Sequence, residues 1–335
     1  MNSWGWGAPR PFAGVRSLAI AATLLAVVLG LGAATAQATR FVPEAQERRA
    51  MSFWTPARMK RARPLNVLRP GSPSVVGAPA QASASSPHVV PPRLPSGAGA
   101  SASLAPETVT DPTAPLTRTN GVIFIVLPFG LGRCSGTSVN SPNFSVVFTA
   151  AHCVHGGGFF GTRSSLHLVF VPGYRYGQRP FGVFPAKWVD TPPLWRETGS
   201  ENFDVAAVVV SRNERGRLLG KVVGGTGIAW GLKARQVFDV HGYSAEEPFD
   251  GETQQLCAGT PFLGHDPRSF LSPGPLNLAV DCEVTGGSSG GGWTIEGNVL
   301  NSVTDYGYSG EPDLNFGPYF GKEVGRLYAR ARRVK

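Results

Sequence analysis

The chain has 335 residues with 43 glycines, 29 prolines and 16% charged residues, a composition that excludes a protein of long helices and favours many turns. Its length allows one large domain or two small ones, each with a proper core. The net charge of +9 would fit a nucleic-acid partner, but residues 119–335 hold 19 basic and 18 acidic groups. Most of the excess therefore lies outside the part with a globular texture, and we expect no nucleic-acid partner.

The first 38 residues have the pattern of an export signal. Arg10 and Arg16 precede an apolar run over 18–31, and Ala36-Gln37-Ala38 follows as a small-residue cleavage site. An uncleaved membrane anchor is the alternative, because the uncharged run is long enough to span a bilayer. The order of the features favours a signal peptide at 1–38. We therefore expect a secreted, extracellular protein without stable membrane association after cleavage.

Residues 39–118 are rich in Pro, Ala, Ser and Gly and show little hydrophobic periodicity. This composition predicts a disordered linker or a pro-segment. Residues 52–62 differ, because Thr55 before Pro56 is a typical helix start and the following residues favour helix. This island is either a short amphipathic piece without a fixed role or part of a pro-segment that docks on the folded domain, as in a zymogen.

From about residue 119 the chain consists of short apolar, β-branched runs separated by turn residues. Such spacing indicates an all-β barrel or sandwich, and neither an internal repeat nor a β-α alternation is visible. The basic tail at 326–335 is expected to form a solvated C-terminal helix. The strand candidates are residues 122–127, 145–149, 166–171, 205–210, 237–242 and 299–303.

All four cysteines lie in this part, and an exported chain favours disulfides. Three pairings are possible in principle. Sequential pairing, Cys134–Cys153 and Cys257–Cys282, closes two short loops, and each disulfide adds about 3 kcal/mol if it acts by restricting the unfolded chain. A zinc site is the alternative, but there is no C-x-x-C pair, so we expect no metal.

Two polar side chains lie at the ends of apolar runs, where a strand can present them. His152 follows the run at 145–149, and imidazole suits a general base near neutral pH. Asp204 begins the run at 205–210, and a buried acid there would fix the imidazole tautomer. The simpler alternatives are a structural histidine and an exposed turn aspartate. Three other acids are candidates by position but do not lead into a buried strand: Asp190, Glu197 and Glu201.

The stretch TGGSSGGG at 285–292 has two adjacent serines among glycines. As a linker it would be flexible and solvated, yet Cys282 precedes it and Trp293 follows it, so it would separate two strands of one domain. The alternative is a tight loop whose backbone N–H groups point at one spot. Glycines permit the dihedral angles that such a loop needs and leave room for a substrate carbonyl.

In the order His, Asp, Ser these segments resemble the chymotrypsin-like (trypsin-fold) serine endopeptidases, over about residues 119–335. TAAHC at 149–153 and the upstream cysteine in GRCSGTSVNS at 132–141 are specific matches. TGGSSGGGW is similar to the family's Gly-Asp-Ser-Gly-Gly-Pro loop, with Ser288 and Gly292 in place of the aspartate and the proline. The resemblance is greatest to secreted bacterial members.

The resemblance implies an all-β fold of two antiparallel Greek-key β-barrels, at about 119–215 and 216–335, with a short C-terminal helix. It implies a triad of His152, Asp204 and Ser289, an oxyanion hole formed by the N–H groups of Gly287 and Ser289, and hydrolysis of peptide bonds through an acyl-enzyme. A polypeptide substrate, no cofactor and a monomer are expected. Because Ser288 replaces the aspartate, we expect any pro-segment to act by masking or by assisting folding.

The substrate pocket is expected near two features. Glu283, six residues before Ser289, either lines the pocket and favours Arg or Lys, or is an exposed or ion-paired glutamate. Ser302, Val303 and Thr304 belong to the segment 301–306, which is expected to pair with an extended substrate and lacks the histidine of glutamate-specific relatives. The alternative function is a catalytically inactive binding or surface protein on the same fold.

Overall fold

The computed structural model describes residues 40–65, 67–77, 86–94, 103–158, 167–296 and 298–335. The predicted signal peptide at 1–38 lies outside the described residues. Strands dominate the described part and its helices are short, which confirms the all-β class. No helix in these ranges is long and apolar enough to cross a membrane.

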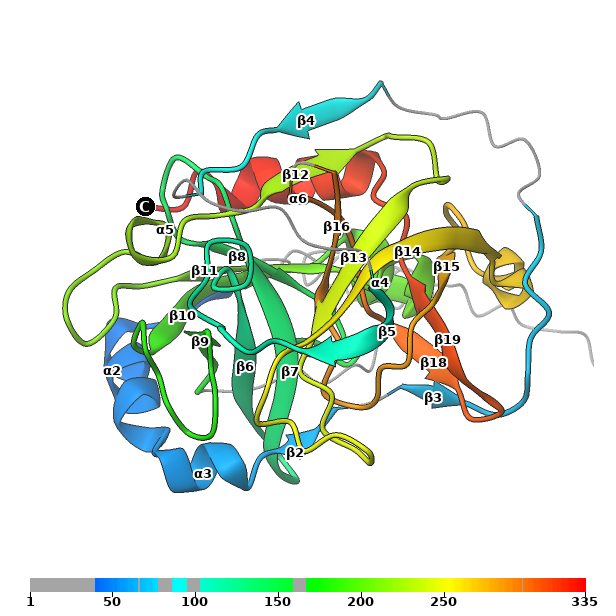
Figure 1. Ribbon diagram of the computed structural model, residues 1–335. Helices are drawn as coiled ribbons and strands as arrows, with labels where there is room; N and C mark the ends of the chain where they lie inside the picture. Colours follow the sequence, from blue (N-terminus) through cyan, green and yellow to red (C-terminus); the bar gives the residue numbers. More distant parts are fainter. Residues whose placement is uncertain (1–39, 66, 78–85, 95–102, 159–166, 297) are drawn as a thin grey trace, which may run out of the picture. The chain divides into compact units, whose positions relative to one another are not determined.

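Six antiparallel strands form the first barrel (Figure 1), in the order β10-β11-β8-β7-β6-β9. The barrel closes because β9 also pairs with β10. Ile123, Val147 and Phe170 are fully buried in its core, as expected for inward-facing residues of a small barrel. The bounds are β6 (Asn120–Leu127), β7 (Gly130–Val139), β8 (Val146–Thr149), β9 (Val169–Pro172), β10 (Phe184–Asp190) and β11 (Ala206–Val210).

The second barrel is formed by a sheet in the order β18-β19-β15-β14-β13-β16-β17-β12. Only β12 and β17 pair in parallel among these strands. Its core contains Phe238, Phe262 and Trp293, and the two-barrel, chymotrypsin-like class is confirmed. The bounds are β12 (Gly227–Trp230), β13 (Val237–Gly242), β14 (Gln255–His265), β15 (Leu278–Asp281), β16 (Gly292–Ile295), β17 (Val299–Val303), β18 (Tyr306–Tyr308) and β19 (Glu311–Gly317).

Both disulfides have the sequential pairing, Cys134–Cys153 and Cys257–Cys282. The first ties the turn after β8 to β7, and the second ties the end of β15 to β14. All four sulfur atoms belong to buried residues of the two barrel cores. Each barrel therefore has one covalent crosslink in its core.

Strand β7 is one that the apolar pattern missed, because glycine and polar residues interrupt it. A Cβ atom on Gly136 would lie 3.0 Å from a methyl carbon of Ile123 and 3.1 Å from one of Val147. The neighbouring strands' side chains thus fill the space beside this residue. Close packing makes the strand glycine-rich and removes the period-2 signal by which strands are recognised.

The C-terminal helix α6 (Lys322–Ala331) begins before the basic tail and is not solvated on all sides. Val324, Leu327 and Tyr328 share the helical spacing of a buried face and pack with Phe148 and other first-barrel residues. Arg330 pairs with buried Asp190, Nε to Oδ2, at 2.6 Å. The helix therefore fastens the end of the chain to the first barrel.

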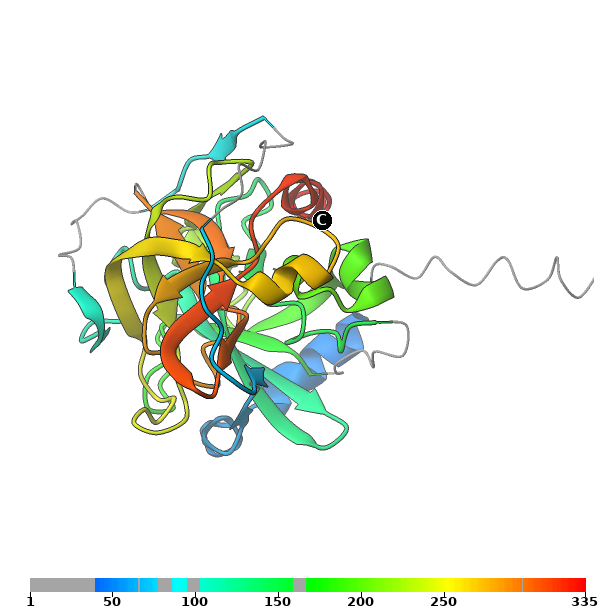
Figure 2. The ribbon, with the colours of Figure 1, turned by 90° about the vertical axis from the view of Figure 1, so that its right-hand side faces the viewer.

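Four short helical segments join the strands, and two of them connect the barrels. Figure 2 shows η2 as the yellow-orange helix near the middle of the view, and Asn202 Nδ2 in η1 donates to the carbonyl of Ser269 in η2 at 2.9 Å. This contact joins a loop of the first barrel to a loop of the second. The bounds are α4 (Pro193–Thr198), η1 (Glu201–Phe203), α5 (Leu219–Val222) and η2 (Pro267–Leu271).

The described parts of 39–118 are not a disordered linker, and this half of the expectation is wrong for them. Five short strands each pair with a barrel strand: β1 with β10, β2 with β7, β3 with β18, β4 with β12 and β5 with β14. Edges with unpaired backbone groups accept an added strand whatever its side chains, so composition did not reveal the pairing. The bounds are β1 (Arg40–Phe41), β2 (Arg63–Pro64), β3 (Leu68–Arg69), β4 (His88–Val90) and β5 (Ser103–Thr108).

Helices α2 (Glu44–Phe53) and α3 (Pro56–Lys60) pack on the first barrel beside β6 and β9 (Figure 1). The predicted helix start is confirmed, because Thr55 Oγ1 accepts from the N–H of Arg58. Trp54 is 1% exposed, its ring centroid lies 5.3 Å from that of Phe124 in a tilted arrangement, and its Nε1 donates to the carbonyl of His167. The island at 52–62 is thus docked on the folded domain.

Trp54→Ala is expected to lower the free energy of unfolding by about 3–5 kcal/mol, the usual cost of deleting a buried tryptophan side chain. Phe129→Ala is the control, because Phe129 is 82% exposed and should change stability by less than about 0.5 kcal/mol. Urea denaturation followed by circular dichroism measures both. Equal stability of the two variants would mean that the helices are not packed on the barrel.

Candidate active site

His152 lies just after β8 in the first barrel. Ala150, Ala151 and Cys153 around it are fully buried, and the disulfide of Cys153 anchors the turn to β7. The histidine side chain itself is 11% exposed. A rigid, buried turn therefore holds the imidazole in one place, with a small part of its side chain exposed.

Asp204, between η1 and β11, holds His152 at two points. Its Oδ1 accepts from the backbone N–H of His152 at 2.8 Å, and its Oδ2 lies 2.7 Å from Nδ1 of the ring. Burial alone would raise the pKa of Asp204, but the charge and hydrogen bonds of His152 hold this pKa below its ordinary value. The ionised carboxylate fixes the tautomer with the proton on Nδ1 and leaves Nε2 as the basic atom.

The loop at 285–292 is tightly held and is not a linker. Ser135 of β7 donates from its N–H to the carbonyl of Ser289 at 2.8 Å and from its Oγ to the carbonyl of Gly287 at 2.9 Å. Gly287 has a φ of +99°, and a Cβ there would lie 2.6 Å from the carbonyl oxygen of Tyr243. Only glycine fits this position, so the glycines serve to shape the loop.

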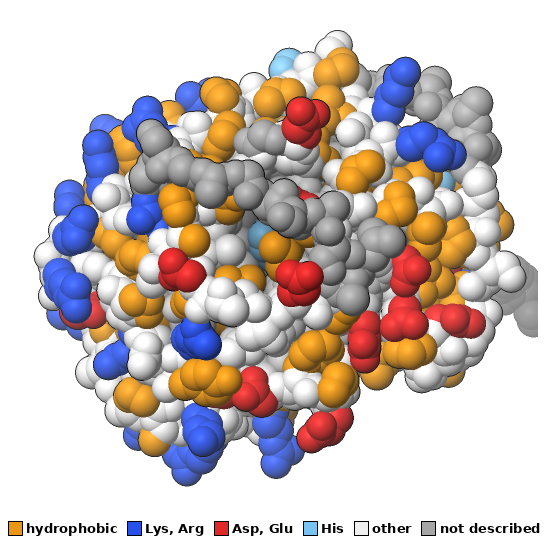
Figure 3. Space-filling view, in the orientation of Figure 1, with side chains coloured by type: hydrophobic (Ala, Val, Ile, Leu, Met, Phe, Trp, Pro, Cys, Tyr) orange, Lys and Arg blue, Asp and Glu red, His pale blue; other side chains and the backbone are white. Residues whose placement is uncertain are grey.

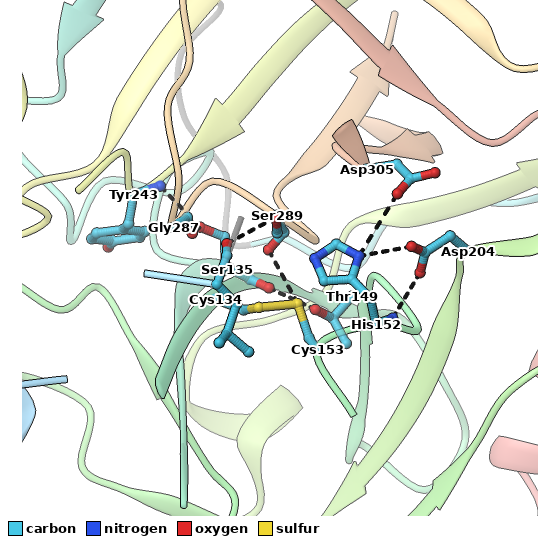
Figure 4. Close-up of a disulfide and its surroundings, with 11 residues drawn as sticks. Cys134, Ser135, Thr149, His152, Cys153, Asp204, Tyr243, Gly287, Ser289 and Asp305 are labelled. Carbon is cyan, nitrogen blue, oxygen red and sulfur yellow. Dashed lines mark hydrogen bonds and ion pairs between the residues drawn. A yellow bond between two sulfur atoms is a disulfide. The ribbon is translucent and has the colours of Figure 1, made fainter. Parts of the chain in front are cut away.

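The two adjacent serines have different surroundings. Ser288 is fully buried, and its Oγ lies 2.7 Å from Oγ of Ser244 in the second barrel. Ser289 lies on the side of the first barrel, and Figure 4 shows the ring of His152 between Ser289 and Asp204. Ser289 is therefore the serine beside the histidine, and Ser288 stabilises the loop from behind.

One peptide carbonyl lies beside Ser289. The oxygen of Leu65 accepts from Oγ of Ser289 at 3.2 Å and from the N–H of Gly287 at 3.3 Å. Nε2 of His152 is buried and has no hydrogen-bond partner among the residues that the structure describes. A carbonyl oxygen can thus lie within reach of both the serine hydroxyl and one backbone N–H donor.

Asp305 is a site residue that the sequence reasoning missed. It is fully buried, its Oδ1 lies 3.7 Å from Nδ1 of His152, and neither of its oxygens meets a donor in the described ranges of the chain. Burial, followed by the neighbouring charge of Asp204, raises its pKa well above the ordinary value. Asp305 therefore keeps its proton to a higher pH than an ordinary aspartate does, and through that proton it can donate a hydrogen bond to Asp204. The sequence did contain a signal: Asp305 is the one charged residue in the strand-like stretch 299–308.

Two clusters bring three potential metal ligands within 4.8 Å of one another in the part of the chain that is described. In the first, Cys134 and Cys153 are bonded to each other and cannot bind a metal. The second is His152, Asp204 and Asp305. A metal on Nδ1 of His152 would displace the proton that this atom shares with Asp204, so a metal and the observed pair exclude each other.

A cavity next to Ser289 contains some of the predicted substrate residues and not others. Thr304 lines it, together with Glu246, Glu311 and Tyr306. Glu283 is partly exposed and is not among the lining residues. The sequence reasoning missed Glu246 because it lies 43 positions before Ser289, on a loop after β13.

The strand edge that pairs with an extended segment is β18, which begins at the end of the expected segment 301–306. Ser302 and Val303 are buried within β17, and Oγ of Ser302 donates to the carbonyl of Pro318. Strand β18 instead pairs with β3. The candidate acids Asp190 and Glu201 also have other partners, Asp190 with Arg196 at 2.9 Å and Glu201 with Arg69.

No protein-family model and no curated protein matches the chain. Solved structures do. Protease Anisep from Arthrobacter nicotinovorans is 31% identical with a TM-score of 0.61, and the match covers 68% of this chain and 100% of that one. The thermostable serine protease AL20 from an extremophilic microorganism is 32% identical with a TM-score of 0.60, over 65% and 98%. A Glu endopeptidase, 18% identical with a TM-score of 0.53 over 68% and 97%, shares the fold.

Asp305→Asn is expected to stabilise the protein increasingly as pH rises. The raised pKa of folded Asp305 means that its proton is retained on folding, so the wild type loses stability from about pH 4 upward, by up to about 1.4 kcal/mol per pH unit. Asparagine can still donate to Asp204 but does not titrate. Urea denaturation should show equal stability near pH 4 and a more stable variant at pH 8.

Asp281→Asn, at an exposed carboxyl, serves as the control. A stability difference between Asp305→Asn and the wild type that stays constant from pH 4 to pH 8 would contradict the protonated state of Asp305.

Proposed function

The chain belongs to the chymotrypsin-like (trypsin-fold) serine proteases, and on this basis we propose that it is an endopeptidase with Ser289 as nucleophile. One observation carries the proposal: a peptide carbonyl oxygen, that of Leu65, accepts hydrogen bonds from both Oγ of Ser289 and the N–H of Gly287. A substrate carbonyl in the same position would be within reach of the nucleophile and of an oxyanion donor at once.

In the first half of the reaction, Oγ of Ser289 attacks the carbonyl carbon of the substrate and its proton moves to Nε2 of His152. The negative charge that develops on the carbonyl oxygen is stabilised by the N–H groups of Gly287 and Ser289. His152 then returns the proton to the leaving nitrogen, the C–N bond breaks, and the acyl group stays on Ser289. Water attacks the ester in the second half, with the same proton path, and releases the acid.

The carboxyl pair behind His152 has two tasks in this scheme. Asp204 keeps the proton on Nδ1 and stabilises the imidazolium that forms during attack. Asp305 keeps its proton and donates a hydrogen bond to Asp204, and so holds that carboxylate toward the ring. With Asp305 neutral, only one negative charge faces His152 in the buried site.

The cavity beside Ser289 favours basic side chains. Glu246 and Glu311 line it, and Oε2 of Glu246 also accepts from the N–H of Gly286 in the loop before Ser289. Figure 3 shows acidic side chains gathered at the lower right of this face, and exposed Asp281 and Asp313 lie on the same sheet. A substrate with Arg or Lys before the cleaved bond would find carboxylates at the cavity. Glu246 and Glu311 replace Glu283 as the residues that set this preference.

The protein is proposed to act outside the cell. Its two disulfides require an oxidising compartment, and the predicted signal peptide at 1–38 would direct it there. Its partners are then polypeptide substrates in the same compartment.

Ser289→Ala should abolish labelling by a fluorophosphonate and lower casein hydrolysis by about 10⁶-fold, the loss seen when the triad serine is removed in other serine proteases. Ser288→Ala is the matched control and should still be labelled, because Ser288 points away from His152. Intact-mass spectrometry reads the label after the wild type has reacted to completion. An unlabelled wild type would favour the inactive binding protein on the same fold.

Glu246→Gln and Glu311→Gln are each expected to reduce kcat/KM for an Arg-ester substrate by roughly 10- to 100-fold, the strength of one charged hydrogen bond, and to leave a Leu-ester within about threefold. Glu283→Gln is the control, since Glu283 does not line the cavity. Equal losses on both esters would show that these glutamates shape the loop and do not select the substrate.

A further inference from the structure

Residues 63–65 and 67–69, called here the cleft segment, run past Ser289 along two strand edges. On one side, β2 pairs in parallel with β7, and the N–H of Leu65 donates to the carbonyl of Arg133 at 3.0 Å. On the other side, β3 pairs in parallel with β18, and the N–H of Gly307 donates to the carbonyl of Val67 at 3.2 Å. The oxygen of Leu65 lies on Ser289 between the two ladders.

Side chains hold the cleft segment in place. Arg69 pairs with Glu201, and its guanidinium lies 4.3 Å from the ring centroid of Tyr306. Val67 packs against the buried aromatic cluster of Tyr306 and Tyr308, and Leu68 lines the cavity beside Ser289. The segment thus fills the position where a substrate would have to bind.

The contact with Ser289 does not lead to reaction. For attack, the hydroxyl proton must point to Nε2 of His152 and a lone pair of Oγ must point to the carbonyl carbon. Here the hydroxyl donates its proton to the oxygen of Leu65, and Nε2 of His152 has no partner among the described residues. The bound carbonyl therefore occupies both the serine and the oxyanion donor without proton transfer.

We propose that the edges of β7 and β18, with Ser289 and Gly287 between them, form a binding site for an extended peptide parallel to both edges, and that the cleft segment is its built-in, uncleaved ligand. This inference rests on the proposed function of Ser289. Because the ligand is tethered, its effective concentration at the site is high, so weak individual contacts are enough to slow reaction at Ser289.

The proposal is tested on the full chain by changing the segment and not the catalytic residues. Arg69→Glu would face Glu201 with a like charge, and Val67→Asp would place a charge against the buried aromatic residues. Arg61→Glu makes the same charge change at an exposed position outside the cleft segment. The rate of fluorophosphonate labelling at Ser289 should rise roughly 10- to 100-fold in the first two variants and stay unchanged in the control.

Two further measurements identify the segment as the cause. Arg69→Glu combined with Glu201→Arg should restore slow labelling. A synthetic peptide with the sequence of residues 61–71, added to Val67→Asp, should slow labelling again and remain intact by mass spectrometry. Cleavage of this peptide after Leu65 would overturn the proposal, since the segment would then be a substrate.

Hydrogen exchange at Gly307 and Ser309 separates this inference from the proposed function. Their N–H groups donate to the carbonyls of Val67 and Arg69, so exchange should be slow in the wild type and faster in Val67→Asp, whether or not Ser289 is reactive. Faster exchange without labelling in any variant would refute the proposed function alone. Equally rapid labelling of the wild type and both variants would refute the built-in ligand alone.

Discussion

The hydrogen bonds of Ser135 hold the two halves of the site in register. This residue belongs to β7 of the first barrel, yet its N–H and its hydroxyl both donate to carbonyls of the Ser289 loop in the second barrel. Thr149 lies at the end of β8, three residues before His152, and its hydroxyl donates to the carbonyl of Ser135. A short chain of hydrogen bonds thus fixes the distance between the imidazole and the nucleophile. Covalent geometry alone could not fix this distance, because the two residues belong to different barrels.

The buried carboxyl pair shows how the site tolerates a second acid. Two ionised carboxylates side by side in a protein interior would repel each other strongly. One proton resolves the conflict, and the structure gives it to Asp305, because Asp204 alone receives hydrogen bonds from His152. The arrangement depends on burial, so it also links the charge state of the site to the integrity of the surrounding core.

The N-terminal part of the chain uses the barrels' strand edges as its attachment points. Helices α2 and α3 contribute buried side chains such as Ala50 and Met59, while the short strands contribute mainly backbone hydrogen bonds. A polar, proline-rich sequence can form such pairs because they require no apolar pattern. For the same reason, the cleft segment can lie on Ser289 mainly through backbone hydrogen bonds, with few specific side chains.

The sequence by itself determined the residue types and order of His152, Asp204 and Ser289, the four cysteines, and those strands that carry continuous apolar runs, such as β6 and β11. These features are local, so spacing and composition reveal them. Strand β7 escaped because close packing demands glycine in it, and the cavity acids escaped because they come from two segments far apart in the chain. Only the tertiary structure decided that Asp305 lies behind His152 and that Leu65, 224 positions before Ser289, lies against it, because contacts between distant segments depend on how the barrels pack and leave no periodic trace in the chain.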